Sequence, residues 1–111
     1  MSDNQIEIPQ SFIALYVKPG RSTPNAPQET VIARYEQCED MASVLTEHAQ
    51  TLAFKENFSE SEVLMRCHQG LLTAPSEFSA DEARWVIQRL AELLGWEAPP
   101  ASQFIQGTPF A

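Results

Sequence analysis

The residues of this chain best suited to chemistry are two cysteines and two histidines, Cys38, His48, Cys67 and His68. A thiolate can act as a nucleophile or metal ligand, and an imidazole as a general base or metal ligand. Cys67 and His68 are adjacent, and adjacent helical residues point about 100° apart, so one metal ion cannot easily bind both. Cys38 and His48 are separated by nearly three helical turns. We therefore expect no metal site and interpret both cysteines as small core residues.

The two histidines lie at the borders of predicted apolar helix faces. His48 falls beside Met41 and Val44, and His68 falls beside the apolar face of the following helix. A general base would need a nucleophile or carboxylate that the fold brings near one of these rings. We expect no catalytic residue. A small enzyme or accessory subunit that uses a Cys/His site is kept as an alternative.

Motifs for nucleotide and cofactor binding are absent from the sequence. The four glycines never approach the spacing of a phosphate-binding loop, and no Gly-Lys-Ser/Thr triplet occurs. HExxH, GxSxG and CxxC motifs are also missing. We therefore expect no cofactor, no ATP binding and no enzymatic activity.

The charge balance is strongly acidic. Seven Lys and Arg against fifteen Asp and Glu give a formal net charge of −8, and the cations are scattered along the chain. Non-specific nucleic-acid binding depends mainly on neutralising phosphates, which this field opposes. Two consecutive predicted helices resemble a helix-turn-helix pair, but the second carries three carboxylates beside Arg84 and Arg89. We expect no nucleic-acid partner and keep a DNA-binding regulator as a further alternative.

Nothing in the sequence predicts insertion into a membrane or secretion. No apolar run approaches the roughly 20 residues that span a bilayer. The first five residues offer no basic region before an apolar stretch, as a secretory signal would require. The expected location is cytoplasmic, where two cysteines are more typical of free thiols than of a disulfide.

A long helix from Pro27 to about Asn57 organises the chain. Its apolar residues recur at alternating steps of four and three, which predicts one core-facing stripe: Val31, Tyr35, Cys38, Ala42, Leu45, Ala49 and Leu52. Pro27 suits the first helical turn because its missing N–H has no partner there. Beyond Leu52 the pattern fails, since Phe54 falls on the polar side.

Two shorter helices follow, and each opens with a Ser-x-x-Glu capping box, at Ser59 and at Ser79. The first should bury Val63, Leu64, Cys67 and Leu71, with Gly70 as a stop or bend near its end. The second should bury Ala83, Val86, Ile87, Leu90 and Leu94, with Leu93 on the shoulder. Gly95 is a helix stop, and Trp96 can fold back as its hydrophobic contact.

The N-terminal apolar run, 10–17, is ambiguous between helix and strand. We favour a short helix that starts at Pro9, because a lone strand would need a partner from a second copy. Residues 18–27 contain three prolines and read as an extended linker. The predicted fold is therefore an all-α small bundle formed by residues 1–97, with an irregular C-terminal tail over 98–111.

Trp85 is the least expected residue of the last helix. It points about 200° away from Ala83, toward the outer face, and Arg89 lies one turn further on. One interpretation is that the tail or the Phe12 segment covers the indole. The other is that Trp85 and Arg89 bind a protein partner, since Trp and Arg are enriched in interface hot spots.

Four segments together resemble a group of small uncharacterised proteobacterial proteins. They are Ile-Pro-x-Ser-Phe-Ile-Ala-Leu-Tyr-Val at 8–17, Pro-Gly-Arg at 19–21, Arg-Tyr-Glu-x-Cys-Glu-Asp at 34–40 and Leu-Ala-Glu-Leu-Leu-Gly-Trp at 90–96. The similarity covers most of the chain through Trp96. Members of this group are sometimes labelled as ATPases with chaperone activity. The resemblance implies a role beside a chaperone or ATPase, as a small acidic adaptor.

We therefore expect a non-enzymatic protein-interaction module with a protein partner. A homodimer is compatible with this interpretation.

Overall fold

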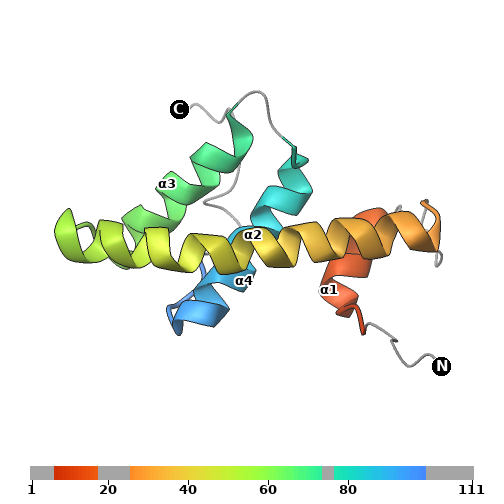
Figure 1. Ribbon diagram of the computed structural model, residues 1–111, viewed down its shortest axis with the longest axis horizontal. Coiled ribbons are helices and arrows are strands. Elements are labelled where there is room, and N and C mark those ends of the chain that lie inside the picture. The colour runs from red at the N-terminus through yellow and green to blue at the C-terminus, as the bar shows by residue number, and fades with distance from the viewer. Residues whose placement is uncertain (1–6, 18–25, 74–76, 100–111) are drawn as a thin grey trace.

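The computed structural model describes residues 7–17, 26–73 and 77–99, and within them the only regular elements are helices (Figure 1). They are α1 (Gln10–Ile13), a 3₁₀ turn η1 (Ala14–Tyr16), α2 (Gln28–Lys55), α3 (Glu60–Leu72) and α4 (Ala80–Leu94). The predicted all-α fold is confirmed, and residues 10–16 are helical rather than a strand. Most of the predicted linker and nearly all of the predicted tail lie outside the described residues.

The long helix begins and ends as its sequence predicts. Pro27 is the residue before the first helical turn, with extended backbone angles, and its carbonyl accepts the N–H groups of Thr30 and Val31. Glu29 in the first turn and Lys55 in the last suit the helix dipole. After the helix ends, Asn57 adopts a left-handed backbone with φ of 63°, a conformation that Asn tolerates better than most residues.

The two later helices use the predicted serine caps, with one difference. Ser79 and Glu82 form the full capping box of α4. Ser59 accepts the N–H of Glu62, but the Glu62 carboxylate accepts a bond from Arg66 instead of turning back. The predicted capping box at Ser59 is therefore only half formed, because an i,i+4 ion pair competes for the Glu62 side chain.

The C-terminal ends of these helices also differ from each other. Gly70 does not end α3, which continues to Leu72. Gly95 ends α4 in the left-handed region at φ 75°, and the N–H of Trp96 donates to the carbonyl of Ala91. That bond, together with Gly95 N–H to Glu92, is the Schellman pattern. Trp96 is half-buried and packs against the core, as predicted.

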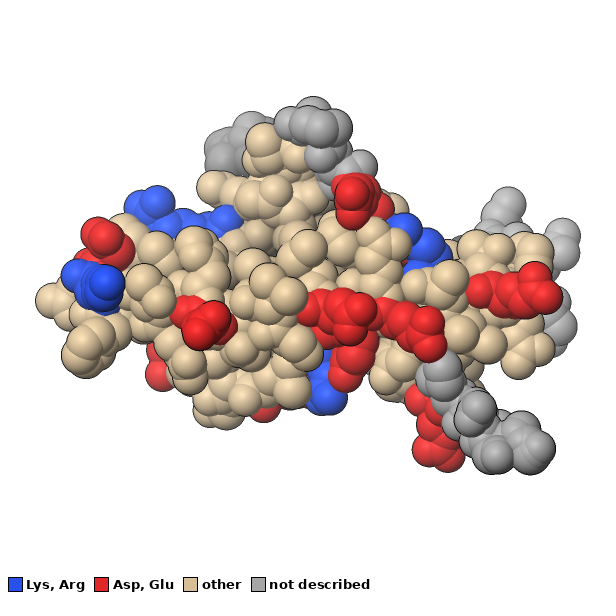
Figure 2. All heavy atoms as spheres, in the orientation of Figure 1, with Lys and Arg blue, Asp and Glu red and all other residues tan. Residues whose placement is uncertain are grey.

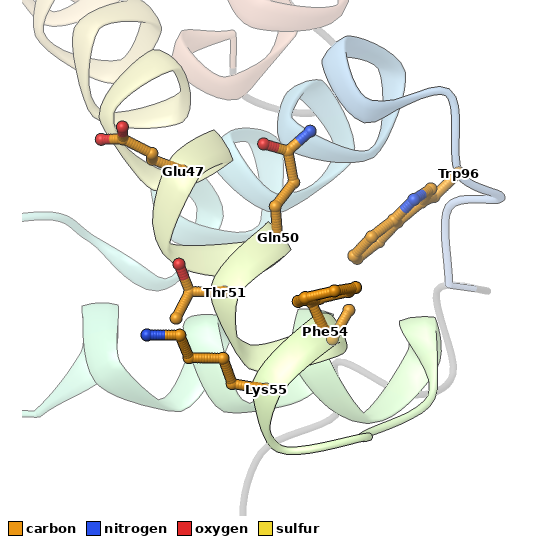
Figure 3. Close-up of a pocket in the computed structure, with 7 residues that line it drawn as sticks. Glu47, Gln50, Thr51, Phe54, Lys55 and Trp96 are labelled. Carbon is orange, nitrogen blue, oxygen red and sulfur yellow. The ribbon is translucent and has the colours of Figure 1, made fainter.

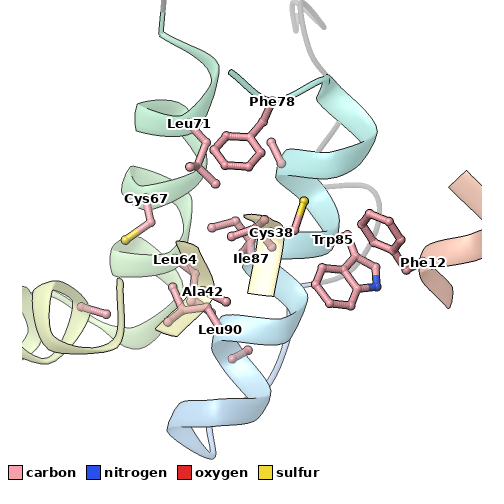
Figure 4. Close-up of a cluster of buried hydrophobic side chains, with 14 of the residues drawn as sticks. Phe12, Cys38, Ala42, Leu64, Cys67, Leu71, Phe78, Trp85, Ile87 and Leu90 are labelled. Atoms are coloured by element: carbon pink, nitrogen blue, oxygen red, sulfur yellow. The ribbon is translucent and has the colours of Figure 1, made fainter. Parts of the chain in front are cut away.

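The core lies where α3 and α4 cross one side of α2. Figure 1 shows both shorter helices running obliquely to α2, with α4 passing behind its middle. Leu64, Ile87 and Leu90 are fully buried, and they meet α2 at its small residues Cys38 and Ala42 (Figure 4). Small residues on α2 allow the crossing helices to approach closely. The apolar stripe of α2 that was predicted from spacing is therefore the surface on which α3 and α4 pack.

Candidate protein-interaction surface

Trp85 is covered by the N-terminal helix, which confirms one of the two interpretations of this residue. Its side chain is only 7 % exposed. The indole lies edge-on to Phe12, with ring centres 5.1 Å apart, and to Tyr35, at 5.8 Å. The indole Nε1–H donates to Ser11 Oγ at 3.0 Å. The polar atom of a buried Trp is thereby satisfied inside the chain.

Arg89 is held by carboxylates from two helices. Its guanidinium donates to Glu39 of α2 at 3.0–3.1 Å and to Glu92 of α4 at 3.0 Å. A cavity of about 280 Å³ separates this group from α1, with Pro9, Gln88 and the edge of Trp85 also in its wall. Trp85 and Arg89 therefore lie together as predicted, but their strongest contacts are internal. Partner binding by this pair stays a prediction.

A buried ion pair joins the N-terminal segment, α2 and α4, and our sequence interpretation did not find it. Arg34 of α2 donates to both carboxylate oxygens of Glu82 of α4, at 2.7 and 3.0 Å. The hydroxyl of Tyr16 donates to the same carboxylate. The Glu82 side chain is 8 % exposed and that of Arg34 is 26 % exposed. Arg34 lies at the border of the apolar stripe, and that position was the only signal in the sequence.

The charge of Glu82 is strongly stabilised. Burial alone would raise the pKa of this carboxyl, but hydrogen bonds from Arg34, Tyr16 and the Ser79 backbone outweigh it and lower the pKa to about 2. The pKa of Tyr16 is raised by burial and by its bond to Glu82. The pKa of Arg34 is raised chiefly by its bond to Glu82. These groups hold η1, α2 and α4 together and are unsuited to proton transfer near neutral pH.

The cysteines and histidines are dispersed over the fold. Cys38 and Cys67 are buried and free, which confirms them as core residues. Burial and the Glu82 charge raise the pKa of Cys38 to about 12, and burial raises the pKa of Cys67. His68 is buried, and burial and Arg84 lower its pKa, whereas His48 is exposed. Within the described ranges, no three His, Cys, Asp or Glu side chains form a group that could hold a metal ion.

A shallow apolar groove lies at the C-terminal end of α2. Phe54 is 86 % exposed, and in Figure 3 its ring lies beside that of Trp96, which follows α4. The groove has a volume of about 590 Å³, and Gln50, Thr51 and Lys55 complete part of its wall. Its volume falls within the range of small ligand pockets, but the groove is open, and one face of α2 supplies most of its wall. We name it the Phe54 groove.

The open face of α2 leads into the Phe54 groove. Val44 lies ten residues before Phe54, about 80° around the helix from it, and is 67 % exposed. Glu47 and Thr51 lie between them and are also exposed. Spacing predicted that Phe54 lies on the polar side of the helix, and its exposure confirms this prediction. Val44, which spacing placed at the border of the apolar face, is exposed as well. The sequence did not show that Trp96 returns to the end of this face.

No family model, curated protein or solved structure matches the chain. Within the described residues, no helix is long and apolar enough to cross a membrane. Function therefore has to be inferred from the chain's own surface.

Proposed function

We propose that the chain is a non-enzymatic protein-interaction module and that its partner docks on the open face of α2, at the Phe54 groove. The observation that carries this proposal is the 86 % exposure of Phe54 beside a second aromatic ring, Trp96. Burying a Phe side chain is worth about 1.5–3 kcal/mol. A partner that covers Phe54 recovers much of this free energy, and clustered aromatic side chains are typical interface anchors.

Two observations argue against the alternative functions, which are an enzyme with a Cys/His site and a DNA-binding regulator. They concern the buried thiols and the arginines of α4. A nucleophilic or metal-binding cysteine needs a lowered thiol pKa, whereas burial raises the pKa of both Cys38 and Cys67. A DNA-reading helix needs cations that are free to meet phosphates. Arg84 is paired with Asp81, and Arg89 is paired with Glu39 and Glu92.

The wider setting of this module is also part of the proposal. An adaptor for a chaperone or ATPase is one form of such a module, and the sequence resemblance is what suggests it. The expected cytoplasmic location belongs to the same proposal.

The test compares partner binding by variants of one exposed helix face. Proteins captured from native cells by the wild-type chain are identified, purified and titrated against each variant by calorimetry. Phe54→Ser should weaken binding by about tenfold or more, as loss of an anchor does. Val44→Ser is the matched control, because Val44 is also exposed but lies outside the groove. Arg89→Gln tests the Trp85 and Arg89 surface separately. Equal binding by the wild type and Phe54→Ser would contradict the proposal.

A further inference from the structure

The open face of α2 carries carboxylates that have no counter-charge in the part of the chain that the structure describes. They are Glu29, Glu36, Asp40 and Glu47, and all four are exposed. Figure 2 shows acidic side chains gathered along the course of α2. By contrast, Glu39, on the flank of the helix that faces α4, is paired with Arg89. Among the described residues, the face that borders the Phe54 groove is therefore mainly negative, with Lys55 as the one cation in the groove wall.

The carboxylates and the groove are in register along the helix. Asp40, Glu47 and Phe54 follow one another at seven-residue intervals. Seven residues advance about 10 Å along an α-helix and return within about 20° of the same side. An apolar site and two negative charges thus lie in one line, with Glu36 one turn further on.

We propose that the occupant of this surface is a basic amphipathic helix of another protein. An apolar side chain of that helix fills the Phe54 groove, and Lys or Arg residues two and four turns away face Glu47 and Asp40. This inference rests on the proposed function and adds the chemistry of the partner to it.

A helix fits the surface better than an extended peptide does. One common way for an extended peptide to bind is to add a strand to a sheet edge, and the described residues contain no strand. A straight helix presents side chains every seven residues to one side, which matches the repeat of Asp40, Glu47 and Phe54. From Glu36 to Phe54 the face is about 27 Å long, so a partner helix of about 18 residues would cover it.

The charges argue against the two occupants that this chain itself could supply. A second copy carries the same net charge of −8 and would bring like charges together. Residues 98–111 contain no Lys or Arg and cannot pair with the carboxylates. A cationic partner relieves the repulsion among the carboxylates of the α2 face and gains opposite charges at the rim of the groove.

The test uses two synthetic 18-residue peptides as probes. One has Leu at helical spacing with Lys elsewhere, and its twin has Glu in place of every Lys. Binding to the full-length protein is measured by fluorescence anisotropy at several salt concentrations. The Lys peptide should bind at least about tenfold more tightly than the Glu peptide, and its binding should weaken as salt is added.

Variants then assign the two parts of the surface. Phe54→Ser should weaken the Lys peptide by about tenfold. The double variant Asp40→Asn/Glu47→Gln should weaken it about threefold to tenfold and reduce its salt dependence. The control variant Glu60→Gln/Asp81→Asn removes two exposed carboxylates that lie outside this surface. It should change neither the affinity for the Lys peptide nor its salt dependence.

Five results would overturn the inference, the last of them without overturning the proposed function. Equal affinity for both peptides would show that charge does not select the partner. An unchanged affinity of the Asp40→Asn/Glu47→Gln protein for the Lys peptide would show the same. A dimer in sedimentation that Phe54→Ser dissociates would make a second copy the occupant. A gain in peptide affinity in Phe104→Ser/Phe110→Ser would make the chain's own tail the occupant. If a purified natural partner needs Phe54 but ignores salt and the two carboxylates, the proposed function survives and only this inference fails.

Discussion

The two halves of α2 have the same helical geometry but very different surroundings. In the N-terminal half, Arg34 pairs with Glu82, Tyr35 packs on Phe12 and Trp85, and Glu39 pairs with Arg89. Side chains from α1, α2 and α4 all meet there. In the C-terminal half, α3 and α4 cover the inner side, whereas the outer side ends in an exposed Phe54.

This difference separates stability from recognition along a single helix. The N-terminal half uses Arg34, Tyr35 and Glu39 to fix neighbouring segments, so its aromatic ring is not free for a partner, whereas Glu36 and Asp40 on its outer side stay exposed. The C-terminal half leaves the same types of group open to solvent. Substitution of a phenylalanine that packs on the N-terminal half and of one that lies in the C-terminal half should therefore have opposite effects on folding and binding.

The largest expected effect is at Phe12, which is fully buried and contacts three aromatic rings. Phe12→Ala should lower the free energy of unfolding by about 3–5 kcal/mol, since it leaves a cavity under Trp85. Urea denaturation measures this loss. In a Trp96→Phe background, the same change should shift the emission of Trp85 to the red.

A milder variant keeps this prediction testable where the alanine variant does not fold. Phe12→Leu retains most of the volume but loses the edge-on ring contacts, and it should cost about 1 kcal/mol or somewhat more. An emission of Trp85 that stays unchanged in both variants would show that another segment covers the indole.

The next effect concerns two glutamates at the same position of two capped helices. Glu82→Gln breaks a buried pair and should cost about 3 kcal/mol. Glu62→Gln is the matched control, because Glu62 also follows a serine cap and also pairs with an arginine, but in solvent. It should cost about 0.5 kcal/mol or less. Equal costs in urea denaturation would mean that burial does not distinguish the two pairs.

The same carboxyl predicts how stability depends on pH. The pKa of Glu82 is about 2 in the folded protein against an ordinary value of 4.5. Its contribution should be complete above pH 4.5 and should be lost as the pH falls toward about 2, because the unfolded chain binds the proton first. The loss is on the order of 3 kcal/mol. Measured as a difference from Glu82→Gln, the wild type should lose its advantage across this range. A constant difference would contradict the ion pair.

Much of the fold could be predicted because its signals are local. The stripe of α2, the serine caps and the Gly95 stop each depend on residues within one or two turns. The Arg34–Glu82 pair could not be predicted in the same way, since its partners are 48 residues apart. The spacing of Arg34 placed it at the edge of the core, but only the crossing of α4 over α2 gives it a partner.

The candidate site was predicted only in part for the same reason. Spacing placed Phe54 on the solvated side of α2, and a helix stop placed Trp96 near the core. The groove between them needs the return of the chain after α4, which no local pattern contains. For Trp85, the position on the outer face of α4 could be predicted from spacing. The segment that covers its indole could not, because that segment, α1, is distant in the sequence.

The smallest expected effect on stability is at Phe54, and it completes the comparison with Phe12. Phe54→Ala should change the free energy of unfolding by no more than about 0.5 kcal/mol, because the ring is 86 % exposed and loses little burial. Alanine also has the higher helix propensity, which offsets part of any loss. The same variant should lose about tenfold or more in affinity for a partner that fills the Phe54 groove. Urea denaturation and calorimetric titration of one preparation measure both quantities. A loss of stability similar to that of Phe12→Ala would show that Phe54 is a core residue, and the open end of α2 would then no longer be a site.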